Sequence, residues 1–369
     1  MNRTLGVGVI GIGHAGARHA RALANGAVEG ACLAAVSDLD PARTEGFGAP
    51  SLPAAELAAA PGVDAVVVAT PHLSHLELAE LALGAGRHVL VEKPLGVEAR
   101  ECDRALRVHA ELGASRPLFG VVHDHRADPR FRWVASLLRR GELGRVERVV
   151  WQATTFFRTE AYYAESPWRG SFAREGGGLL VNQAPHLFDT LSWLFGMPRR
   201  VLGICRFGRF HEIEVEDDMT AHFEFASGMT ALLVASTGES PGSSRLEISA
   251  DRGQLVLEGD SATVHRTKES VRDFRRREAS GRPRSEVEHV VFPPEERAAA
   301  PVLANFVQAI RGEARLFAPA DQARNAVELA NAVLWSSLRE GPIDLPLDTT
   351  GFQRVQNELR QGGRRANSG

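Results

Sequence analysis

The fold of this chain is decided by the stretch GVGVIGIGHAGARH, residues 6–19. Its apolar residues have the length of a buried strand, and a helical pattern follows at residues 15–24. Between them Gly11, Gly13 and Gly16 have the spacing G-x-G-x-x-G. The first glycine allows a tight turn, the second lets a pyrophosphate approach the backbone, and the third lets helix and strand pack closely. The stretch predicts a dinucleotide-binding loop, with a glycine-rich turn that binds nothing as the alternative.

The composition is that of an ordinary globular chain. Its 369 residues, 44% apolar and 24% charged, have the size of two domains. The formal net charge of −3 gives no reason to expect a nucleic acid or an anionic membrane as a partner. Three distant cysteines without a C-x-x-C pair predict neither disulfides nor a cysteine zinc site. This cysteine pattern fits a reducing cytoplasm, where we expect the protein. No apolar run reaches the ~18 residues of a membrane span, and we interpret residues 5–10 as a strand and not as a signal peptide.

The first 120 residues alternate strand-like and helix-like segments. Apolar runs at residues 32–36, 65–69, 88–91 and 118–122 are typical of strands buried on both faces of a parallel sheet. This order predicts an α/β fold with a doubly wound parallel sheet, which binds ligands at the carboxyl ends of its strands. We assign this cofactor-binding domain to residues 1–126.

One acidic residue lies where a dinucleotide ribose is expected. Asp38 follows Gly16 by 22 residues, close to the ~20 expected for the acid that hydrogen-bonds the adenosine ribose. A carboxylate there repels a 2′-phosphate and so favours NAD, whereas the nearby Arg43 keeps NADP as an alternative. A turn role for Asp38 before Asp40-Pro41 is also open.

Lysine is rare in this chain, which draws attention to Lys93. The only other lysine among 43 basic residues is Lys268. Lys93 stands between Glu92 and Pro94 at the end of a predicted strand, and an ammonium has a pKa that can move, unlike a guanidinium. We interpret Lys93 as functional and Lys268 as an ordinary loop residue.

After Pro129 the pattern changes to one helix, a sheet and two further helices. The segments predict a largely antiparallel sheet, with a hairpin turn at Ala226-Ser227-Gly228. We assign a C-terminal α+β domain to residues 127–350 and a C-terminal tail to residues 351–369, disordered from residue 361. The predicted helices are residues 131–140, 302–311 and 322–338, and the predicted strands are residues 146–156, 219–225, 229–236, 246–250 and 254–257.

The charged segment 266–298 contains the cluster Arg275-Arg276-Arg277. Acidic residues are interleaved with the arginines, and no aromatic platform accompanies them. We therefore interpret the segment as a solvated hairpin or loop and not as a nucleic-acid site.

A second candidate for chemistry is EGGGLLVNQAPH, residues 175–186. Its three glycines allow the close approach of a cofactor or substrate. Asn182 and His186 are four residues apart and would share one helix face. Pro185 would kink that helix unless it lies in a first turn. We interpret His186 as catalytic, with a structural histidine as the alternative.

These motifs together resemble the Gfo/Idh/MocA oxidoreductases, which include glucose–fructose oxidoreductase and inositol dehydrogenases. The resemblance covers nearly the whole chain and implies a Rossmann domain followed by an α+β domain with an open, mostly antiparallel sheet. It also implies a homodimer or homotetramer formed through that sheet, and often a cis peptide bond before Pro94. The motifs are Gly11-x-Gly13-x-x-Gly16, Glu92-Lys93-Pro94, Arg126-x-x-Pro129, and Gly177-Gly178 followed by Asn182 and His186.

The resemblance implies an NAD-dependent, or alternatively NADP-dependent, interconversion of a secondary alcohol and a ketone on a sugar, sugar derivative or cyclitol. In this hypothesis His186 takes the hydroxyl proton, Lys93 stabilises the developing charge on the same oxygen, and the nicotinamide accepts the hydride. The residues expected to contact the cofactor are Gly11, Ile12, Gly13, His14, Ala15, Gly16, Asp38, Thr70, Pro71, His75, Glu92 and Lys93.

The substrate contacts are expected from the glycine run and from the aromatic loop before it. Aromatic rings stack on sugar faces, and arginines bind anions. Two histidines at His123 and His125 share at most one strand face, so we expect no metal. The predicted substrate contacts are Arg126, Tyr163, Trp168, Arg169, Asn182, Gln183 and His186.

Asn182 is a departure, because many family members have aspartate there. Asparagine orients a hydroxyl but takes no proton and holds no charge, so the substrate class stays open. Two rival functions remain. One is a non-catalytic sugar or dinucleotide sensor on the same scaffold. The other is a glycosidase-type enzyme that oxidises its sugar transiently with bound NAD.

Overall fold

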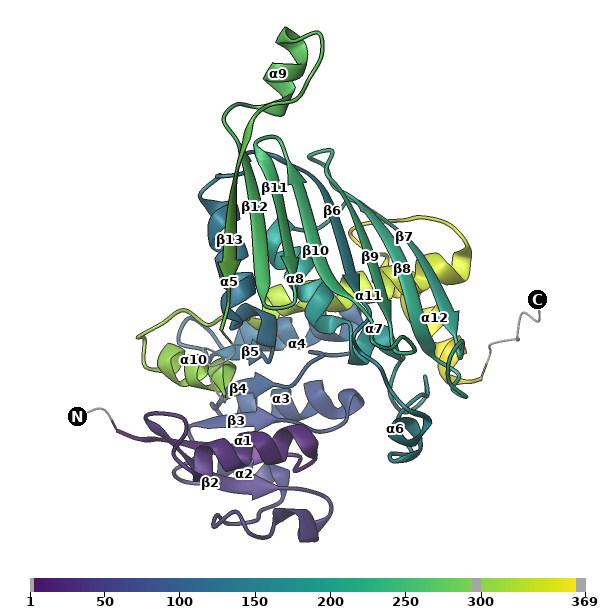
Figure 1. Ribbon diagram of the computed structural model, residues 1–369. Helices are drawn as coiled ribbons and strands as arrows, with labels where there is room; N and C mark the ends of the chain where they lie inside the picture. Colours follow the sequence, from purple (N-terminus) through teal and green to yellow (C-terminus); the bar gives the residue numbers. More distant parts are fainter. Residues whose placement is uncertain (1–2, 294–299, 363–369) are drawn as a thin grey trace.

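The computed structural model describes residues 3–293 and 300–362. Its first part is a five-stranded sheet in the order β2-β1-β3-β4-β5, with all neighbouring strands parallel (Figure 1). The predicted doubly wound parallel sheet is confirmed. Its elements are β1 (Leu5–Ile10), α1 (His14–Ala24), β2 (Ala31–Ser37), η1 (Pro41–Thr44), α2 (Ala54–Ala59), β3 (Ala65–Val68), η2 (His72–Ser74), α3 (His75–Gly84), β4 (His88–Val91), α4 (Ala99–Glu111) and β5 (Phe119–Val121).

Both faces of this sheet are covered, which is why its strands are continuous apolar runs. Leu57 of α2, Leu83 of α3 and Cys102 of α4 belong to the buried cluster on one face. Leu23 of α1 and Phe306 of α10 (Pro301–Ile310) belong to the cluster on the other. The chain therefore returns after residue 300 to cover the sheet that it began.

The second part is a nine-stranded sheet in the order β13-β12-β11-β10-β6-β9-β8-β7-β14. Every neighbouring pair is antiparallel except β6 and β9, which are parallel, so the expected mostly antiparallel sheet is confirmed. Its strands are β6 (Val146–Ala153), β7 (Arg200–Phe207), β8 (Glu216–Glu224), β9 (Thr230–Ser236), β10 (Ser244–Ala250), β11 (Gly253–Glu258), β12 (Ser261–Thr267), β13 (Ser285–Val291) and β14 (Ile343–Asp344).

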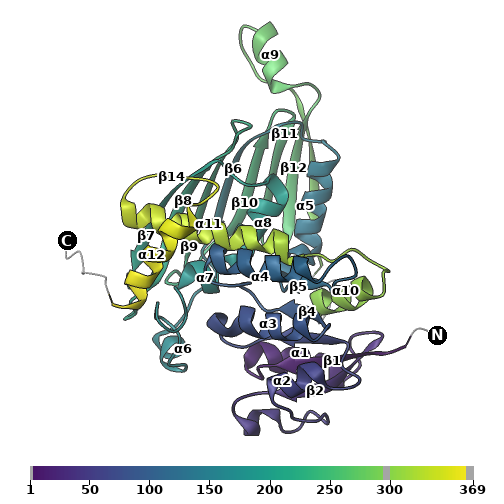
Figure 2. The ribbon, with the colours of Figure 1, turned by 180° about the vertical axis from the view of Figure 1, so that it is seen from behind.

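Helices pack on only one face of the large sheet. The helices α5 (Pro129–Arg139), α8 (Pro185–Phe195) and α11 (Ala320–Arg339) lie behind it in Figure 1 and in front of it in Figure 2, and within the described part of the chain no helix covers its other face. Helix α11 packs on β7 and α8, and also on α4 and β5 of the first part. This one helix therefore joins the two sheets. The limits at residues 126 and 350 stay a prediction.

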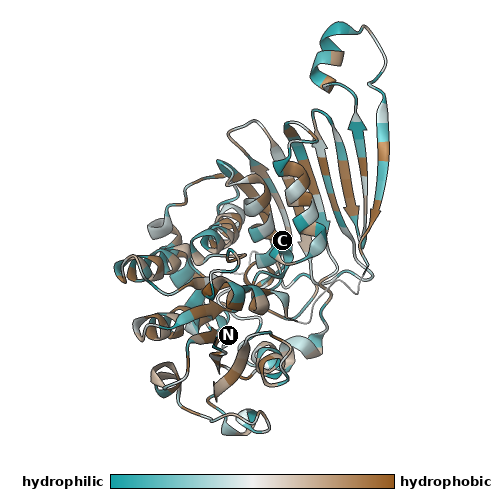
Figure 3. Cartoon of the chain, turned by 90° about the vertical axis from the view of Figure 1, so that its left-hand side faces the viewer, coloured by the Kyte–Doolittle hydropathy of each residue, from teal (hydrophilic) through white to brown (hydrophobic). Residues whose placement is uncertain are grey.

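Part of the charged segment projects beyond the large sheet as an arm, while β13 belongs to the sheet and residues 294–298 lie outside the described residues. The hairpin β12–β13 carries α9 (Val271–Arg277) at its tip, and α9 is mostly hydrophilic in Figure 3. The expected hairpin is present, and the arginine cluster lies on its helix. Ser270 caps that helix, and Arg277 pairs with Glu269 and Glu278.

Several elements lie where the sequence analysis assigned none. Among them are α2, η3 (Asp124–Arg126), α6 (Glu160–Ala164), β7, β12, β14 and α12 (Thr349–Arg360). Helix α12 packs on α4 and α11 through buried residues such as Phe352. Most of the segment predicted as a tail, up to residue 360, is therefore a packed helix. Residues 363–369 lie outside the described part. No helix among the described residues is both long and apolar enough to cross a bilayer.

Candidate active site

The glycine loop connects β1 to α1 and has the geometry that its spacing predicts. Gly11 has a φ of +88°, the left-handed region that glycine adopts most easily. A Cβ on Gly16 would lie 1.7 Å from the Gly11 carbonyl oxygen, so only glycine allows this close packing. A Cβ on Gly13 would meet no atom within 4 Å, which leaves room for a ligand against the backbone.

The amino terminus of α1 offers backbone donors beside this open space. Gly13 is its N-cap and supplies no side-chain acceptor, and the first turn has no acidic residue. The first helical bond runs from Ala17 N–H to the Gly13 carbonyl, so the amides of His14, Ala15 and Gly16 precede it and have no partner within the helix. Such a terminus fits the pyrophosphate of a dinucleotide.

Asp38 joins the end of β2 to the glycine loop. Its Oδ2 accepts a hydrogen bond from Ile12 N–H at 2.6 Å, and its Oδ1 accepts one from Asp40 N–H at 2.9 Å. The expected turn role is therefore present. The ribose role stays a prediction, supported by a carboxylate beside the loop. Arg43 lies on the surface and pairs weakly with Asp40 at 3.5 Å.

Lys93 lies at the carboxyl end of β4 and reaches into the second part of the molecule. Its peptide bond to Pro94 is cis, as the resemblance implied. Its Nζ donates to the Asn182 carbonyl oxygen at 2.5 Å and lies 3.3 Å from Asn182 Oδ1. Burial lowers the pKa of Lys93, whereas the charges of Glu92 and Glu175 raise it. Lys268, in contrast, forms an exposed pair with Glu286.

Glu92 is buried and bonded, so its carboxylate is ionised. Its Oε1 lies 2.8 Å from His19 Nε2, and Arg18 lies 3.8 Å away. Burial opposes ionisation, but His19 and then Lys93 and Arg18 outweigh it and lower the pKa of Glu92 to about 2. The sequence analysis missed His19, although it lies on α1 just after the glycine loop.

The remaining predicted cofactor residues do not play equal roles. Thr70 and Pro71 follow β3 at the same edge of the sheet as the glycine loop. His75 is fully buried, with Nδ1 2.7 Å from the Pro94 carbonyl and Nε2 2.8 Å from the Thr70 carbonyl. Its expected direct contact with cofactor is therefore corrected, because its ring lies beneath the two loops and holds them together.

The expected single helix from Asn182 to His186 is wrong. The chain forms a short α7 (Leu179–Asn182), breaks, and starts α8 with Pro185 in its first turn, the position where proline fits. Asn182 and His186 therefore lie on separate helices. The break lets the carbonyl of Asn182 accept from Lys93 while His186 points toward the loop after β5.

His186 lies in a cluster of three histidines. Its Nδ1 is 3.4 Å from His123 Nδ1, and its ring centre is 5.5 Å from that of His125. Burial, then His123, His125 and Lys93, lower the pKa of His186 well below its ordinary value, so it is neutral at pH 7. The premise that His123 and His125 lie on one strand is wrong, because β5 ends at Val121 and η3 turns both rings toward His186.

A buried carboxylate stands behind Asn182. Glu175 Oε1 accepts from Asn182 Nδ2 at 2.6 Å, and its Oε2 accepts from Gly170 N–H at 2.6 Å. Burial raises the pKa of Glu175 to about 7, and the nearby Glu216 adds to the rise. The sequence analysis quoted this residue as the start of the glycine run but gave it no role.

The aromatic loop brings Tyr162 to the site. The Tyr162 hydroxyl is 3.3 Å from Asn182 Nδ2 and 3.5 Å from Gln183 Nε2. Tyr163 lies 3.4 Å from Thr237 Oγ1 and lines a separate cavity of about 790 Å³ with Arg169, so its substrate contact stays a prediction.

Two other predicted contacts, Arg169 and Trp168, lie at the edge of the site. The Arg169 guanidinium lies 4.0 Å from the Tyr162 ring centre and bonds to Glu165. Trp168 packs edge-on against His72. Neither contact excludes a ligand role, which stays a prediction for both.

Arg126 is not available to substrate, contrary to expectation. It is 2% exposed and makes two bonds to Asp189, at 2.8 and 2.7 Å. Its remaining donor bonds to the Phe317 carbonyl and to Gln322. The arginine therefore ties η3 to α8 and to the start of α11.

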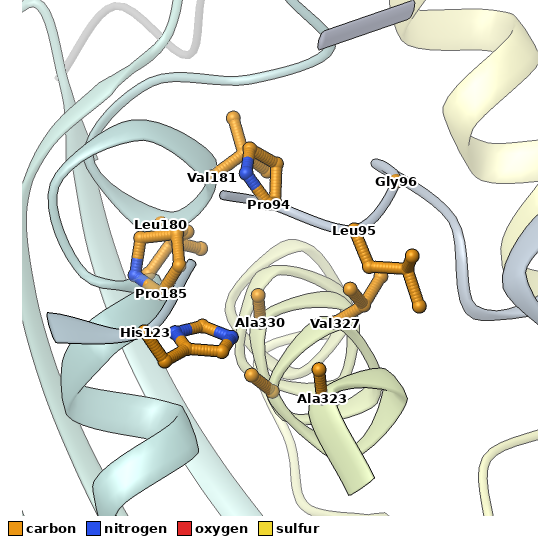
Figure 4. A pocket seen from close by; sticks show the side chains of 11 residues that line it. Pro94, Leu95, Gly96, His123, Leu180, Val181, Pro185, Ala323, Val327 and Ala330 are labelled. Carbon is orange, nitrogen blue, oxygen red and sulfur yellow. The ribbon is translucent and has the colours of Figure 1, made fainter. Parts of the chain in front are cut away.

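The loop after Lys93 packs closely against apolar side chains of α11. Figure 4 shows Pro94 and Leu95 facing Ala330 and Val327 of α11, with Pro185 beside them. The void between them has about 10 Å³, no more than one water needs, so it holds no ligand. This packing fixes the backbone that carries Lys93.

A larger cavity of about 320 Å³ lies on the other side of the histidine cluster. His125 and Leu187 line it next to His186, and Trp151, Phe131 and Phe156 supply aromatic surface. This volume is comparable to the lower range of small-molecule sites.

The fold and the loop define a class: two-part proteins with a dinucleotide-binding parallel sheet and an open antiparallel sheet. Two family descriptions match the chain, namely the oxidoreductase family with an NAD-binding Rossmann fold over residues 5–115, and the GFO/IDH/MocA C-terminal domain over residues 131–256. The chain belongs to the Gfo/Idh/MocA family of oxidoreductases, and its first domain is an NAD-binding Rossmann domain.

Curated relatives are inositol dehydrogenases among others. The inositol 2-dehydrogenase of Streptomyces avermitilis is 40% identical over 213 residues, 56% of this chain and 57% of the relative. Inositol 2-dehydrogenase 2 of Saccharopolyspora erythraea is 34% identical over 199 residues, 52% of this chain and 54% of the relative. The chain spans about half the length of the curated relatives it matches.

Solved structures show the same fold at lower identity. The WlbA dehydrogenase of Bordetella pertussis, in complex with NADH and UDP-GlcNAcA, has a TM-score of 0.77 at 24% identity and covers 94% of this chain and all of its own. Levoglucosan dehydrogenase with NADH and L-sorbose has a TM-score of 0.79 at 18% identity, covering 94% of this chain and 100% of its own.

Proposed function

We propose that the protein is an NAD-dependent dehydrogenase that interconverts a secondary alcohol and a ketone on a sugar, sugar derivative or cyclitol, with NADP as the alternative cofactor. The observation that carries the proposal is the meeting of Lys93, Asn182 and His186 at the carboxyl ends of the parallel strands. Lys93 reaches Asn182 across the two parts of the molecule, and its charge acts on His186. The glycine loop lies at the same edge of the sheet.

The two key side chains divide the acid–base work. His186 is neutral at pH 7, so it is ready to take the hydroxyl proton. Lys93 donates hydrogen bonds and stabilises the charge that develops on the same oxygen. The bound nicotinamide supplies the hydride acceptor. Asn182 and Gln183, with Tyr162 between them, position neighbouring hydroxyls.

The substrate class is supported by the cavity that His125, a neighbour of His186, lines. Aromatic faces stack on the apolar faces of sugar rings, and Phe156 lines this cavity beside Trp151 and Phe131, the latter already stacked on His125. Relatives named inositol 2-dehydrogenase and structural neighbours with sugar ligands agree with this class. A panel of candidate substrates identifies the particular sugar or polyol.

We propose further that the bare face of the large sheet forms a homodimer or homotetramer. A row of residues crosses it from β7 to β6 in register, Leu202, His222, Leu232 and Val150. Leu202 is 42% exposed and Ile204 two residues on is 51% exposed, which is unusual for leucine and isoleucine in a sheet. Several exposed apolar side chains on one uncovered sheet face favour association.

The proposal is tested by single-turnover hydride transfer with NAD and a panel of sugars, sugar acids, inositols and nucleotide sugars. We expect Lys93→Met and His186→Ala to lower the rate by about 10²-fold or more. Lys268→Met is the matched control, because the other lysine is exposed, and it should keep the wild-type rate. Wild-type rates in both site variants would overturn the assignments.

The same panel separates the rival functions. A dehydrogenase releases NADH in proportion to substrate. A transient oxidation releases product without net NADH, and a sensor binds cofactor without turnover on any substrate of the panel.

A further inference from the structure

A chain of hydrogen bonds leads from Lys93 to a carboxylate that no motif identified. Lys93 Nζ lies 3.3 Å from Asn182 Oδ1, and Asn182 Nδ2 donates to Glu175 Oε1 at 2.6 Å. The second oxygen of Glu175 accepts from Gly170 N–H. Glu175 is 1% exposed, so this carboxylate is held at one place by the protein and not by solvent.

We propose that Glu175 is a positioning residue that acts on Lys93 through the Asn182 amide, and that the pair Asn182–Glu175 replaces the single carboxylate expected at position 182. This inference rests on the proposed function. Glu175 does not touch the reacting oxygen. It orients the amide and supplies the negative charge that an asparagine lacks.

The orientation follows from donor and acceptor chemistry. An amide has one acceptor end and one donor end. With Nδ2 bonded to the Glu175 carboxylate, Oδ1 faces the ammonium of Lys93. The ammonium of Lys93 favours the same orientation, because it can only donate, and the Glu175 carboxylate reinforces it by accepting at the other end of the amide. Polarisation along the chain also makes Oδ1 a better acceptor when Glu175 is ionised.

The charge of Glu175 reaches Lys93 as well. Burial lowers the pKa of Lys93, and Glu92 and Glu175 are the two groups that counter it most. Because Glu92 is already bonded to His19, Glu175 is the carboxylate whose state can still change near neutral pH. Its pKa, raised to about 7 by burial, lies where a small change in surroundings alters its charge.

Several charged or titratable groups surround Glu175, and some of them shift its pKa. Glu216 on β8 raises its pKa and Arg169 lowers it. His72 in η2 contacts its backbone carbonyl, with the pKa of the His72 ring held well below its ordinary value. Tyr162 approaches through Asn182, and Tyr163 stays protonated with a pKa of about 12.

A consequence follows for the pH dependence of the reaction. The pKa of His186 is well below its ordinary value, so His186 gives no change in rate near pH 7. We expect kcat/KM to rise as pH passes through about 7, when Glu175 ionises. Glu175→Gln should lose this rise, and Glu216→Gln should move it to lower pH because a like charge is removed.

The decisive experiment is an NMR titration of Lys93, which needs no substrate. Its signal is easy to assign because the chain has only two lysines. Protein labelled with ¹³C at lysine Cε gives two signals, and Lys268→Arg identifies the one from Lys93. We expect the pKa of Lys93 to fall in Glu175→Gln by about half a unit or more, and to recover in the double variant Glu175→Gln/Asn182→Asp. The double variant places the carboxylate directly beside Lys93.

Each outcome of the titration decides the proposal. An unchanged pKa of Lys93 in Glu175→Gln, or no recovery in the double variant, overturns it. If Glu175→Gln does not fold, Glu175→Asp tests the idea, because it keeps a carboxylate but withdraws it from Asn182 Nδ2, and it must lower the pKa of Lys93. The titration does not depend on turnover. A protein that oxidises nothing in the panel would contradict the proposed function, whereas the titration alone decides the role of Glu175.

Discussion

At the scale of single residues, burial explains the unusual charge states in this site. Glu92, Glu175 and Glu216 are all nearly inaccessible, yet only Glu92 has a pKa far below the ordinary value. The difference is the partner, because Glu92 meets His19 and Lys93 whereas Glu216 accepts only backbone amides. The backbone hydrogen bonds of Glu216 offset only part of the desolvation that raises its pKa, because no cation accompanies them.

The first prediction concerns Glu216. Burial raises its pKa to about 7, above the 4.5 of an unperturbed glutamate, so its protonated form stabilises the fold below about pH 4.5 and that stability is lost as pH rises through about 7. Glutamine keeps the Oε1 acceptor for Gly178 and Leu180 and never ionises. We expect Glu216→Gln to match wild type near pH 4.5 and to be more stable by roughly 1–3 kcal/mol above pH 7.

Urea unfolding at both pH values measures this difference. A change of the same size at both values would assign it to packing and not to ionisation. Asp217, the neighbouring acid, accepts from three backbone amides and from His211, and serves as the contrast in which Asp217→Asn should destabilise at neutral pH.

At the scale of elements, the turn from β1 into α1 separates packing from binding. Gly16 is needed because α1 contacts the Gly11 carbonyl, whereas Gly13 faces open space. The two glycines stand three residues apart in one motif and have different physical roles.

The second prediction compares alanine at these two positions. Gly16→Ala forces a Cβ against a backbone oxygen and should cost about 1–3 kcal/mol of unfolding free energy. Gly13→Ala should cost less than about 1 kcal/mol but weaken NAD binding by about tenfold or more, because the methyl group occupies the space for the pyrophosphate. Thermal unfolding and titration calorimetry with NAD check the pair. Equal loss of stability in both variants would refute the assignment.

Element periodicity explains which helices and strands were predictable. Strand β3 is buried and apolar throughout, and β4 is so from Val89 to Val91, so both runs stood out in the sequence. The strand β7 alternates buried and exposed residues, but its exposed residues Leu202 and Ile204 are apolar too, which obscured the alternation. The break between α7 and α8 was hidden because Asn182 and His186 have ideal helical spacing.

At the scale of the whole molecule, α11 and the bare sheet face have opposite roles. Helix α11 holds the two parts together by packing on both. The bare face carries apolar side chains that the described chain does not cover.

The third prediction tests association through that face. We expect Leu232→Glu, at the centre of the row on β9, to reduce the oligomer to monomers in light scattering. Leu81→Glu is the matched control, because Leu81 is 39% exposed against 36% for Leu232 but lies on α3, away from the large sheet. If Leu232→Glu and wild type have the same mass, another surface makes the oligomer, or none does.

The sequence by itself determined the parallel sheet, the glycine loop and the placement of Lys93, because each is a local pattern of apolar runs, glycines and strand ends. Only the tertiary structure decided that Glu175 bonds to Asn182, that His123 and His125 lie against His186, and that Arg126 forms a buried ion pair with Asp189. The histidine and arginine contacts join residues far apart in the chain, and the contact of Glu175 with Asn182 depends on how the glycine run between them turns. Their geometry depends on how α8, α11 and the loops pack, and no local pattern records that packing.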